Sequence, residues 1–341
     1  MFDILRWIRA LPGIIAQKFT WIITAIGAYI TYKIMDFPSL ISALPGAVAQ
    51  GLIWSIMAIG VYITYKIMDI ADLTVDGTLC TGGAVCLVMI INGHSLPVAI
   101  LAAILAGGLC GLVTGILHTF MGIPPILSGI LTQIGLYSVN LKILGKANVG
   151  LSSLAYNVLV SLRTINRSLL ILAIIVLVVI LFLYWLFGTE RGCSLRATGC
   201  NENMAKAQGI NTNVNKVIGL VISNALVGLS GALMTQYQGF ADINMGRGAI
   251  VIGLAAVIIG EALVGRFFKN FGLHLLSVVI GAVLYYIVLQ FVIWLEIDTD
   301  LLKILQAVVV AIFLAVPYWK RRYFTKPKLI TEDENVKEEV E

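Results

Sequence analysis

Two sets of apolar runs are separated by the polar stretch Gly188-Thr-Glu-Arg-Gly-Cys-Ser-Leu-Arg-Ala-Thr-Gly-Cys-Asn-Glu-Asn-Met-Ala-Lys-Ala-Gln-Gly-Ile-Asn-Thr-Asn-Val-Asn-Lys216. Its Arg and Lys residues indicate the cytoplasmic side, because short loops rich in these residues stay there during membrane insertion. Asn201 can cap a short helix, and Gly209 can end it in the left-handed conformation. The stretch therefore predicts a small surface helix that would offer a docking surface to a partner. The expected helix consists of Glu202, Asn203, Met204, Ala205, Lys206, Ala207 and Gln208.

The composition is that of an integral membrane protein. Hydrophobic residues make up 59% of the chain and charged residues 12%, and the mean hydropathy is +0.97, whereas a soluble domain has about 25% charged residues. The net charge of +5 comes from basic residues at helix ends, without the interleaved aromatic face of a nucleic-acid-binding surface. The five cysteines fit neither a disulfide framework nor a metal pair, and we interpret them as structural. We therefore expect contact with a lipid bilayer and none with nucleic acid.

About ten apolar runs are long enough to cross a hydrocarbon core of about 30 Å. They lie near 18–35, 46–68, 77–92, 96–117, 125–145, 168–187, 217–238, 248–265, 272–295 and 301–318. The sequence thus predicts an all-α polytopic membrane protein. Basic residues at 320–322 place the C-terminus in the cytoplasm, and counting spans backward places the polar loop and the N-terminus there as well. Four basic residues around an external loop go against this rule: Lys142, Lys146, Arg163 and Arg167.

The two ends of the chain lie outside this regular alternation. Two arginines opposite apolar positions near the N-terminus predict an interfacial helix over 1–17. We interpret residues 18–43 as an extra, duplicated transmembrane helix, because 21–36 recurs almost unchanged as 54–69; whether this copy crosses the membrane is left open. Residues 319–341 are polar, end acidic and lack periodicity, and they predict a disordered cytoplasmic tail.

A second, fainter repeat relates the two halves of the chain. Ile70-Ala-Asp-Leu-Thr-Val-Asp-Gly-Thr-Leu-Cys-Thr-Gly-Gly-Ala-Val85 aligns without gaps on Phe240-Ala-Asp-Ile-Asn-Met-Gly-Arg-Gly-Ala-Ile-Val-Ile-Gly-Leu-Ala255. Each copy joins two apolar runs through Ala-Asp, a polar break and a glycine. The predicted topology puts the first break inside and the second outside, as in transporters with inverted repeats and broken half-helices. The candidate pathway residues at these breaks are Asp72, Thr74, Asp76, Gly77, Asp242, Asn244 and Gly246.

Structural roles are open for several of these polar residues. Thr74 or Asp76 could cap the helix that follows the first break, which does not exclude a place in the pathway. Glu261 lies near the inner end of its span, where Arg266 or Lys269 could neutralise its charge. The alternative for Glu261 is a role in coupling or proton movement.

The chain lacks the sequence motifs of an ATPase or a hydrolase. It has no Gly-x-x-x-x-Gly-Lys-Ser/Thr phosphate loop, no His-Glu-x-x-His zinc pair and no Gly-x-Ser-x-Gly elbow. We therefore expect a non-enzymatic protein with no catalytic residue, cofactor or metal of its own. If ATP drives its transport, another polypeptide must bind the nucleotide and its Mg²⁺.

From about Leu44 to Pro317 the chain resembles the inner-membrane permeases of the branched-chain amino acid and ribose class of ABC importers. The pieces that carry the resemblance are residues 51–77, the Arg-Ala-Thr-Gly-Cys-Asn-Glu-Asn-Met-Ala-Lys-Ala-Gln-Gly-Ile-Asn run at 196–211, and Gly-Leu-Ser-Gly-Ala-Leu from Gly228. The resemblance implies a permease domain over 44–318 in a bacterial cell membrane, with a cytoplasmic coupling loop at 188–216.

The same resemblance implies partners and a substrate class. Asn201 and the seven residues after it are similar to the coupling helix that enters a groove on an ATPase subunit. A second permease copy, in a homodimer or a close heterodimer, and an extracellular substrate-binding lipoprotein are also implied. The Leu-Thr-Val-Asp-Gly variant at 73–77 looks like a subgroup linked to tryptophan or tyrosine uptake, so the implied solute is one of these or a branched-chain amino acid.

Two alternatives concern the outer surface and the energy source. Arg163 and Arg167 could pair with carboxylates of the binding protein, because rim charges steer encounter, or they could be ordinary snorkelling residues at a helix start. The competing function is a secondary transporter driven by an ion gradient, which would need carboxylates near mid-membrane. Asp76 and Glu261 are the candidates for that role, and both lie toward helix ends.

Overall fold

The computed structural model describes residues 37–152, 156–265 and 270–295, together with 304, 306–308, 310–312 and 315. The main helices are α2 (Phe37–Tyr62), α3 (Val75–Ile91), α4 (Leu96–Thr119), α5 (Pro125–Leu144), α6 (Ile165–Gly188), α9 (Thr212–Gln238), α10 (Ala249–Gly260) and α11 (Phe271–Trp294). The shorter helical elements are α7 (Glu190–Cys200), α8 (Glu202–Ala207), the π-helical turns η1 (Ile63–Ile67) and η3 (Glu261–Gly265), and the 3₁₀ turn η2 (Leu162–Thr164). Two strands, β1 (Asn148–Gly150) and β2 (Phe240–Asp242), pair antiparallel.

Six of the described helices are long and apolar enough to cross a membrane, so the chain is a multi-pass membrane protein. Two expected spans are shorter apolar helices, Val75–Ile91 and Ala249–Gly265. The expected number of about ten is not confirmed, because the expected span at 18–35 lies outside the described residues and only isolated residues of 301–318 are described.

Both predicted terminal segments also lie outside the described residues. These are the interfacial helix at 1–17 and the tail at 319–341, and the same holds for most of the extra helix at 18–43. The first described helix, α2, begins at Phe37, well before the expected start at 46.

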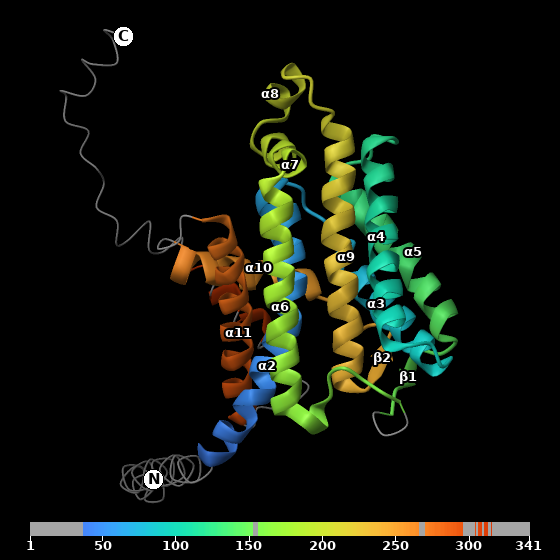
Figure 1. Ribbon diagram of the computed structural model, residues 1–341, viewed down its shortest axis with the longest axis vertical. Helices are drawn as coiled ribbons and strands as arrows, with labels where there is room; N and C mark the ends of the chain where they lie inside the picture. The colour runs from blue at the N-terminus through green and yellow to red at the C-terminus, as the bar shows by residue number, and fades with distance from the viewer. Residues whose placement is uncertain are drawn as a thin grey trace, which may run out of the picture.

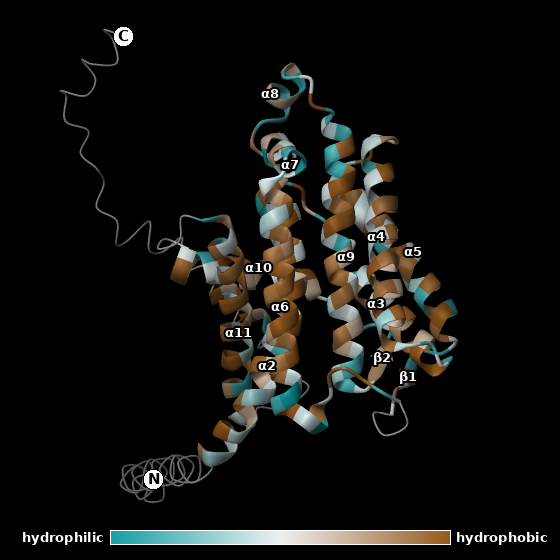
Figure 2. Ribbon diagram, in the orientation of Figure 1, coloured by the Kyte–Doolittle hydropathy of each residue, from teal (hydrophilic) through white to brown (hydrophobic). Residues whose placement is uncertain are grey.

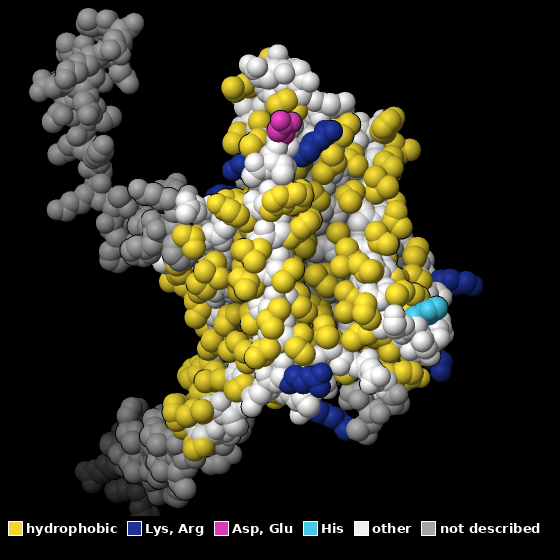
Figure 3. All heavy atoms as spheres, in the orientation of Figure 1, with side chains coloured by type: hydrophobic (Ala, Val, Ile, Leu, Met, Phe, Trp, Pro, Cys, Tyr) yellow, Lys and Arg dark blue, Asp and Glu magenta, His cyan; other side chains and the backbone are white. Residues whose placement is uncertain are grey.

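The outer surface of the long helices is apolar. Leu105 on α4 and Leu181 on α6 are 68% and 58% exposed. Hydrophobic side chains cover the middle of the molecule, whereas Lys and Arg side chains lie toward its ends (Figure 3). An apolar band of this size on a helical bundle is the surface that lipid acyl chains would cover.

The molecule has two distinct ends, which we call the loop end and the strand end. Helices α7 and α8 project at the loop end, and β1 and β2 lie at the strand end (Figure 1). The loop end is also the more hydrophilic part of the helical region (Figure 2). Phe271, at the start of α11, stacks on Phe187, at the end of α6, with ring centroids 4.9 Å apart. The end of α6 and the start of α11 therefore lie at the same end of the molecule, and α6 and α9, on either side of the polar loop, run in opposite directions (Figure 1).

Contacts between helices relate the two halves of the chain. We call residues 68–74, between η1 and α3, the first break, and residues 239–248, between α9 and α10, the second break. Helix α2 precedes the first break and packs on α10 and α11, which follow the second; α9 precedes the second break and packs on α3 and α4, which follow the first. Helices α2 and α9 run in opposite directions and contact each other (Figure 1). This exchange of partners is the one expected of two inverted repeats.

Two glycines bring α9 close to its neighbours. A Cβ at Gly228 would meet the backbone of α4 at Ala103, and a Cβ at Gly231 would meet the backbone of α3 at Leu79. Small residues allow such close backbone approach between membrane helices, where packing replaces the hydrophobic effect. The Gly-Leu-Ser-Gly-Ala-Leu stretch thus forms the contact surface between α9 and the helices after the first break.

Candidate functional site

The predicted surface helix in the polar loop is α8. The Asn201 side chain caps it by accepting a hydrogen bond from Met204 N at 3.0 Å. Gly209 follows the helix with a φ of 78°. Both the predicted cap and the predicted left-handed stop are confirmed.

A second helix in this loop, α7, was not predicted from the sequence. It is attached to α9 by Asn215, whose Nδ2 donates to Ser194 Oγ at 2.7 Å and to Thr198 Oγ1 at 2.8 Å. Helix α9 begins at Thr212, earlier than the expected start at 217. The polar loop is therefore a two-helix projection joined to the first turns of α9.

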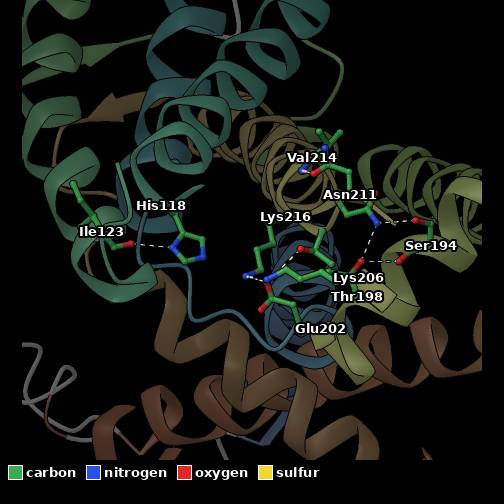
Figure 4. A network of polar contacts seen from close by, with 11 residues as sticks. His118, Ile123, Ser194, Thr198, Glu202, Lys206, Asn211, Val214 and Lys216 are labelled. Atoms are coloured by element: carbon green, nitrogen blue, oxygen red, sulfur yellow. Dashed lines mark hydrogen bonds and ion pairs between the residues drawn. The ribbon is translucent and has the colours of Figure 1, made fainter. Parts of the chain in front are cut away.

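Glu202 attaches α8 to α9. Its Oε1 lies 2.8 Å from Lys216 Nζ and 2.9 Å from Lys206 Nζ (Figure 4). The Thr212 hydroxyl also donates to this oxygen, at 3.3 Å. The hydrogen bonds from Lys216 and Lys206 lower the pKa of Glu202 to about 2. Glu202 therefore stays ionised at neutral pH and holds the start of α8 against α9.

The other side of α8 is open. Ala205 is 2% exposed and packs inward, whereas Met204 is 63% exposed. Exposed methionine is common on binding surfaces because its side chain adapts to different partners. We define the open face of α8 as Asn203, Met204, Lys206, Ala207 and Gln208.

Helix α7 rests directly on the first break. A Cβ at Gly199 would overlap the backbone of Ile67 and Met68. The chain reverses at this point, because Asp69 has a φ of 54° and Ile70 N donates to a carbonyl within η1 at 2.9 Å. A displacement of α7 would therefore be transmitted to the reversal that opens the first break.

Asp72 lies in the packed interior of the first break, only 3% exposed. Its Oδ1 accepts from Thr74 N at 2.9 Å, and its Oδ2 accepts from Asn224 Nδ2 at 2.7 Å. Asn224 Oδ1 in turn accepts from the Thr78 hydroxyl at 2.7 Å. The Thr74 hydroxyl is 2.7 Å from that of Thr114 on α4. Asp72 and Thr74 therefore join α3, α4 and α9, and they lie away from the cavity described below.

The carboxylate of Asp76 joins the two breaks. It accepts from Gly248 N at 2.9 Å and from Ile250 N at 3.0 Å. Asp76 thus caps α10, whose first amides have no partner within their own helix. The prediction that Thr74 or Asp76 caps the helix after the first break is wrong, since Thr74 makes no side-chain cap bond. Gly246 lies against the Asp76 carbonyl, where a Cβ would overlap it.

Asp242 repeats the turn that Asp72 makes. Its Oδ1 accepts from Asn244 N at 2.7 Å, as Asp72 Oδ1 accepts from Thr74 N. Its Oδ2 accepts from Asn148 Nδ2 at 3.2 Å. Asp242 and Asn244 lie at the strand end and do not line the cavity, although Gly246 of the same break reaches Asp76.

A cavity of about 400 Å³ opens between α3, α5 and the second break. Of the predicted pathway residues, Asp76 and Gly77 line it. Its other lining residues were not predicted: Gln133, Ile134, Tyr137, Ser138, Asn140, Ile243 and Arg247. A polar side chain inside an apolar span is energetically unfavourable and commonly functional. Asn140 was therefore the one sequence signal that could have indicated this part of the cavity lining.

Glu261 has a partner that the sequence did not indicate. Its Oε2 lies 3.1 Å from Lys66 Nζ. The expected partners, Arg266 and Lys269, lie outside the described residues. The ion pair joins η1 and η3, the last turns of α2 and α10, near the loop end.

Arg163 and Arg167 lie at the strand end, opposite α8. Both side chains are exposed at the start of α6, and the Ser161 hydroxyl accepts from Arg163 N at 3.3 Å. Together with the three residues between them they border a hollow of about 400 Å³. The structure therefore separates the two predicted docking surfaces by the full length of the molecule.

Comparison with known proteins is consistent with this architecture. Residues 44–315 match the family described as "Branched-chain amino acid transport system / permease component". The chain is 41% identical to the tyrosine transport system permease protein of Clostridioides difficile (strain R20291) over 303 residues, which cover 89% of this chain and 90% of that protein.

More distant relatives are permeases for other solutes. The chain is 30% identical to the galactofuranose transporter permease protein YtfT of Escherichia coli (strain K12) over 220 residues, 62% of this chain and 61% of that protein. It is 29% identical to the autoinducer 2 import system permease protein LsrC of Escherichia coli (strain K12 / DH10B) over 185 residues, 52% of each chain. No solved structure matches the chain.

Proposed function

The chain belongs to the branched-chain amino acid transport permease family, and from this premise we propose that it is the membrane subunit of an ATP-driven amino acid importer. The proposed solute is tyrosine or tryptophan, or else a branched-chain amino acid. The extensive similarity to a permease named for tyrosine transport supports an amino acid over a sugar. ATP and Mg²⁺ would be bound by a separate ATPase subunit.

The observation that carries this proposal is a continuous route of contacts from α8 to the second break. Glu202 holds α8 on α9, and Gly199 of α7 rests on Ile67 and Met68, where η1 meets the first break. The first break leads into α3, whose Asp76 caps α10. A force applied at α8 would therefore move two half-helices together, which is the motion that alternating access requires.

The two ends of the molecule would bind different partners. The ATPase subunit would bind the open face of α8, with the loop end and both termini in the cytoplasm. A substrate-binding lipoprotein would approach the strand end, where the Arg163 and Arg167 charges would steer it. A second permease copy would complete the pathway.

The first test is co-purification from the native membrane with Met204→Glu. This change puts a charge at the centre of the open face without touching the Glu202 ion pairs. Val214→Glu is the matched control, because Val214 is a 45% exposed apolar residue near the start of α9. We expect wild type and V214E to recover a P-loop ATPase and M204E to recover about tenfold less. Equal recovery with both variants would contradict docking through α8.

The energy source is tested separately in proteoliposomes. Uptake of labelled tyrosine, tryptophan or leucine should require ATP and the ATPase subunit. Uptake under an ion gradient with no ATPase recovered from any sample would instead indicate the secondary transporter.

A further inference from the structure

We propose that the cavity between α3, α5 and the second break binds one α-amino acid in its zwitterionic form. Arg247 would hold the substrate carboxylate, and Asp76 with Asn140 would hold the ammonium group. The inference rests on the proposed function, since it names the substrate site of the same permease. It explains polar groups of the cavity that the helix contacts leave without a role.

Arg247 is a cation in the lining of the cavity. It lies on the second break, between Gly246, which packs against the Asp76 carbonyl, and Gly248, whose amide donates to the Asp76 carboxylate. Its side chain is exposed to the cavity and forms no ion pair among the described residues. A guanidinium beside apolar spans is costly unless it meets water or an anion. A carboxylate is the group that its planar donors bind best.

Asn140 supplies an acceptor without a donor. The residue is 1% exposed, and its Nδ2 donates to Gly77 O at 3.3 Å. Its Oδ1 is buried and has no hydrogen-bond partner in the described part of the chain. An unsatisfied buried carbonyl is unfavourable. A donor that reaches this oxygen from the cavity would satisfy it.

Asp76 can accept a further hydrogen bond from the cavity. Its carboxylate accepts the backbone amides of Gly248 and Ile250 and is also bonded by the amide of Ala249, whereas an ionised carboxylate offers about four acceptor sites. An ammonium group has three donors. Asp76 and Asn140 could therefore share one ammonium while Arg247 binds the carboxylate.

The rest of the cavity fits a large side chain with a polar tip. Ile134 and Tyr137 of α5 and Ile243 of the second break supply apolar and aromatic surface. A volume of about 400 Å³ is near the lower end of small-molecule sites, about 300–1,000 Å³. Gln133 and Ser138 could bond a phenol or indole group. A neutral sugar would leave the Arg247 charge unpaired, so the lining favours an amino acid.

The test measures equilibrium binding to the full-length chain in lipid nanodiscs. The probe is tritiated L-tyrosine, displaced by unlabelled L-tyrosine, by tyramine, which lacks the carboxylate, and by 3-(4-hydroxyphenyl)propionate, which lacks the ammonium group. The variants are Arg247→Gln, Arg247→Lys, Asn140→Ala and the control Lys142→Gln, which removes an exposed cation from α5 outside the cavity.

We expect the wild type and K142Q to bind L-tyrosine about tenfold or more tightly than either analogue. R247Q should lose the preference over tyramine while keeping its Kd for tyramine, and R247K should recover part of it. N140A should lose preference over the propionate analogue and not over tyramine.

Three results would overturn the inference. They are equal preference in R247Q and K142Q, an equal loss of tyrosine and tyramine binding in R247Q, and no displaceable binding of tyrosine, tryptophan or leucine by the wild type. None of these bears on ATP dependence, because the binding assay needs no ATPase. ATP-driven uptake with unchanged analogue preference in R247Q would leave the proposed function standing and remove the site.

Discussion

The two breaks contain the same Ala-Asp pair and form the same turn, yet they lie in opposite surroundings. In both, the Asp side chain accepts a hydrogen bond from the amide two residues later, at 2.9 Å for Asp72 and 2.7 Å for Asp242. Asp72 is buried and its second oxygen binds Asn224 of α9. Asp242 is partly exposed and its second oxygen binds Asn148, an exposed residue of β1.

The difference teaches that the repeated sequence determines the turn and that packing determines its role. The first break is a joint fixed between α3, α4 and α9 and covered by α7. The second break borders the cavity and contributes Arg247 to it. Asp76 connects the two. It lies on α3, which follows the first break, and it holds the first turn of α10, which follows the second break.

The largest expected effect is a loss of stability caused by a substitution in the first break. Asp72→Ala leaves Thr74 N without a buried acceptor, together with one of the two N–H groups of Asn224 Nδ2, whose other N–H donates to Leu220 O at 3.0 Å. It should lower the free energy of unfolding by about 3 kcal/mol. Asp242→Ala removes the same turn where water can replace the carboxylate, and it should cost less than about 1 kcal/mol. The comparison fails if the two variants lose equal stability.

Buried cysteines provide the measurement. Cys80, Cys86 and Cys110 are free and buried, so a thiol-reactive dye reports their exposure as the chain unfolds. Cys193 and Cys200 are exposed and should first be replaced by serine to remove the background. The apparent Tm of D72A and D242A is then compared in this common background.

Local features of the molecule could be predicted from the sequence, and distant contacts could not. The Asn201 cap and the Gly209 stop depend on adjacent residues, so their chemistry was visible in the chain. The contact between Asp76 and Gly248 joins residues 172 positions apart, and a carboxylate at a helix start looks like a cap for its own helix.

Two further misses have physical causes. Helix α7 has no apolar periodicity to reveal it, and two of its residues, Gly192 and Gly199, are poor helix formers. These glycines allow the backbone of α7 to pack closely against neighbouring backbone, a contact that only the fold shows. Arg247 was within the repeat that aligns the breaks, but it stands opposite Gly77, so the alignment alone indicated no shared role.

An intermediate effect is expected where α7 meets the first break. Gly199→Ala adds a Cβ that overlaps the Ile67 carbonyl, and such overpacking should cost about 2 kcal/mol. Gly188→Ala is the matched control, because a Cβ there has no heavy atom within 4 Å. We expect G199A to lower the Tm and the ATP-dependent uptake per transporter, with G188A unchanged. Wild-type uptake in G199A would show that this contact does not link the polar loop to the first break.

The smallest expected effect is the pH dependence of Glu202, at the far end of the route to the first break. Its pKa of about 2 lies below the ordinary value of 4.5. Its ion pairs therefore stabilise the fold above pH 4.5, and this contribution disappears as the pH falls toward about 2. Because the carboxylate is 36% exposed, Glu202→Gln should cost less than about 1 kcal/mol at neutral pH. The Tm difference from wild type should be constant from about pH 8 to 5 and shrink below that.

Glu190→Gln is the control, because it removes the same charge from α7, where Glu190 forms no ion pair among the described residues. A difference that grows on acidification would show that α8 is not held by these ion pairs.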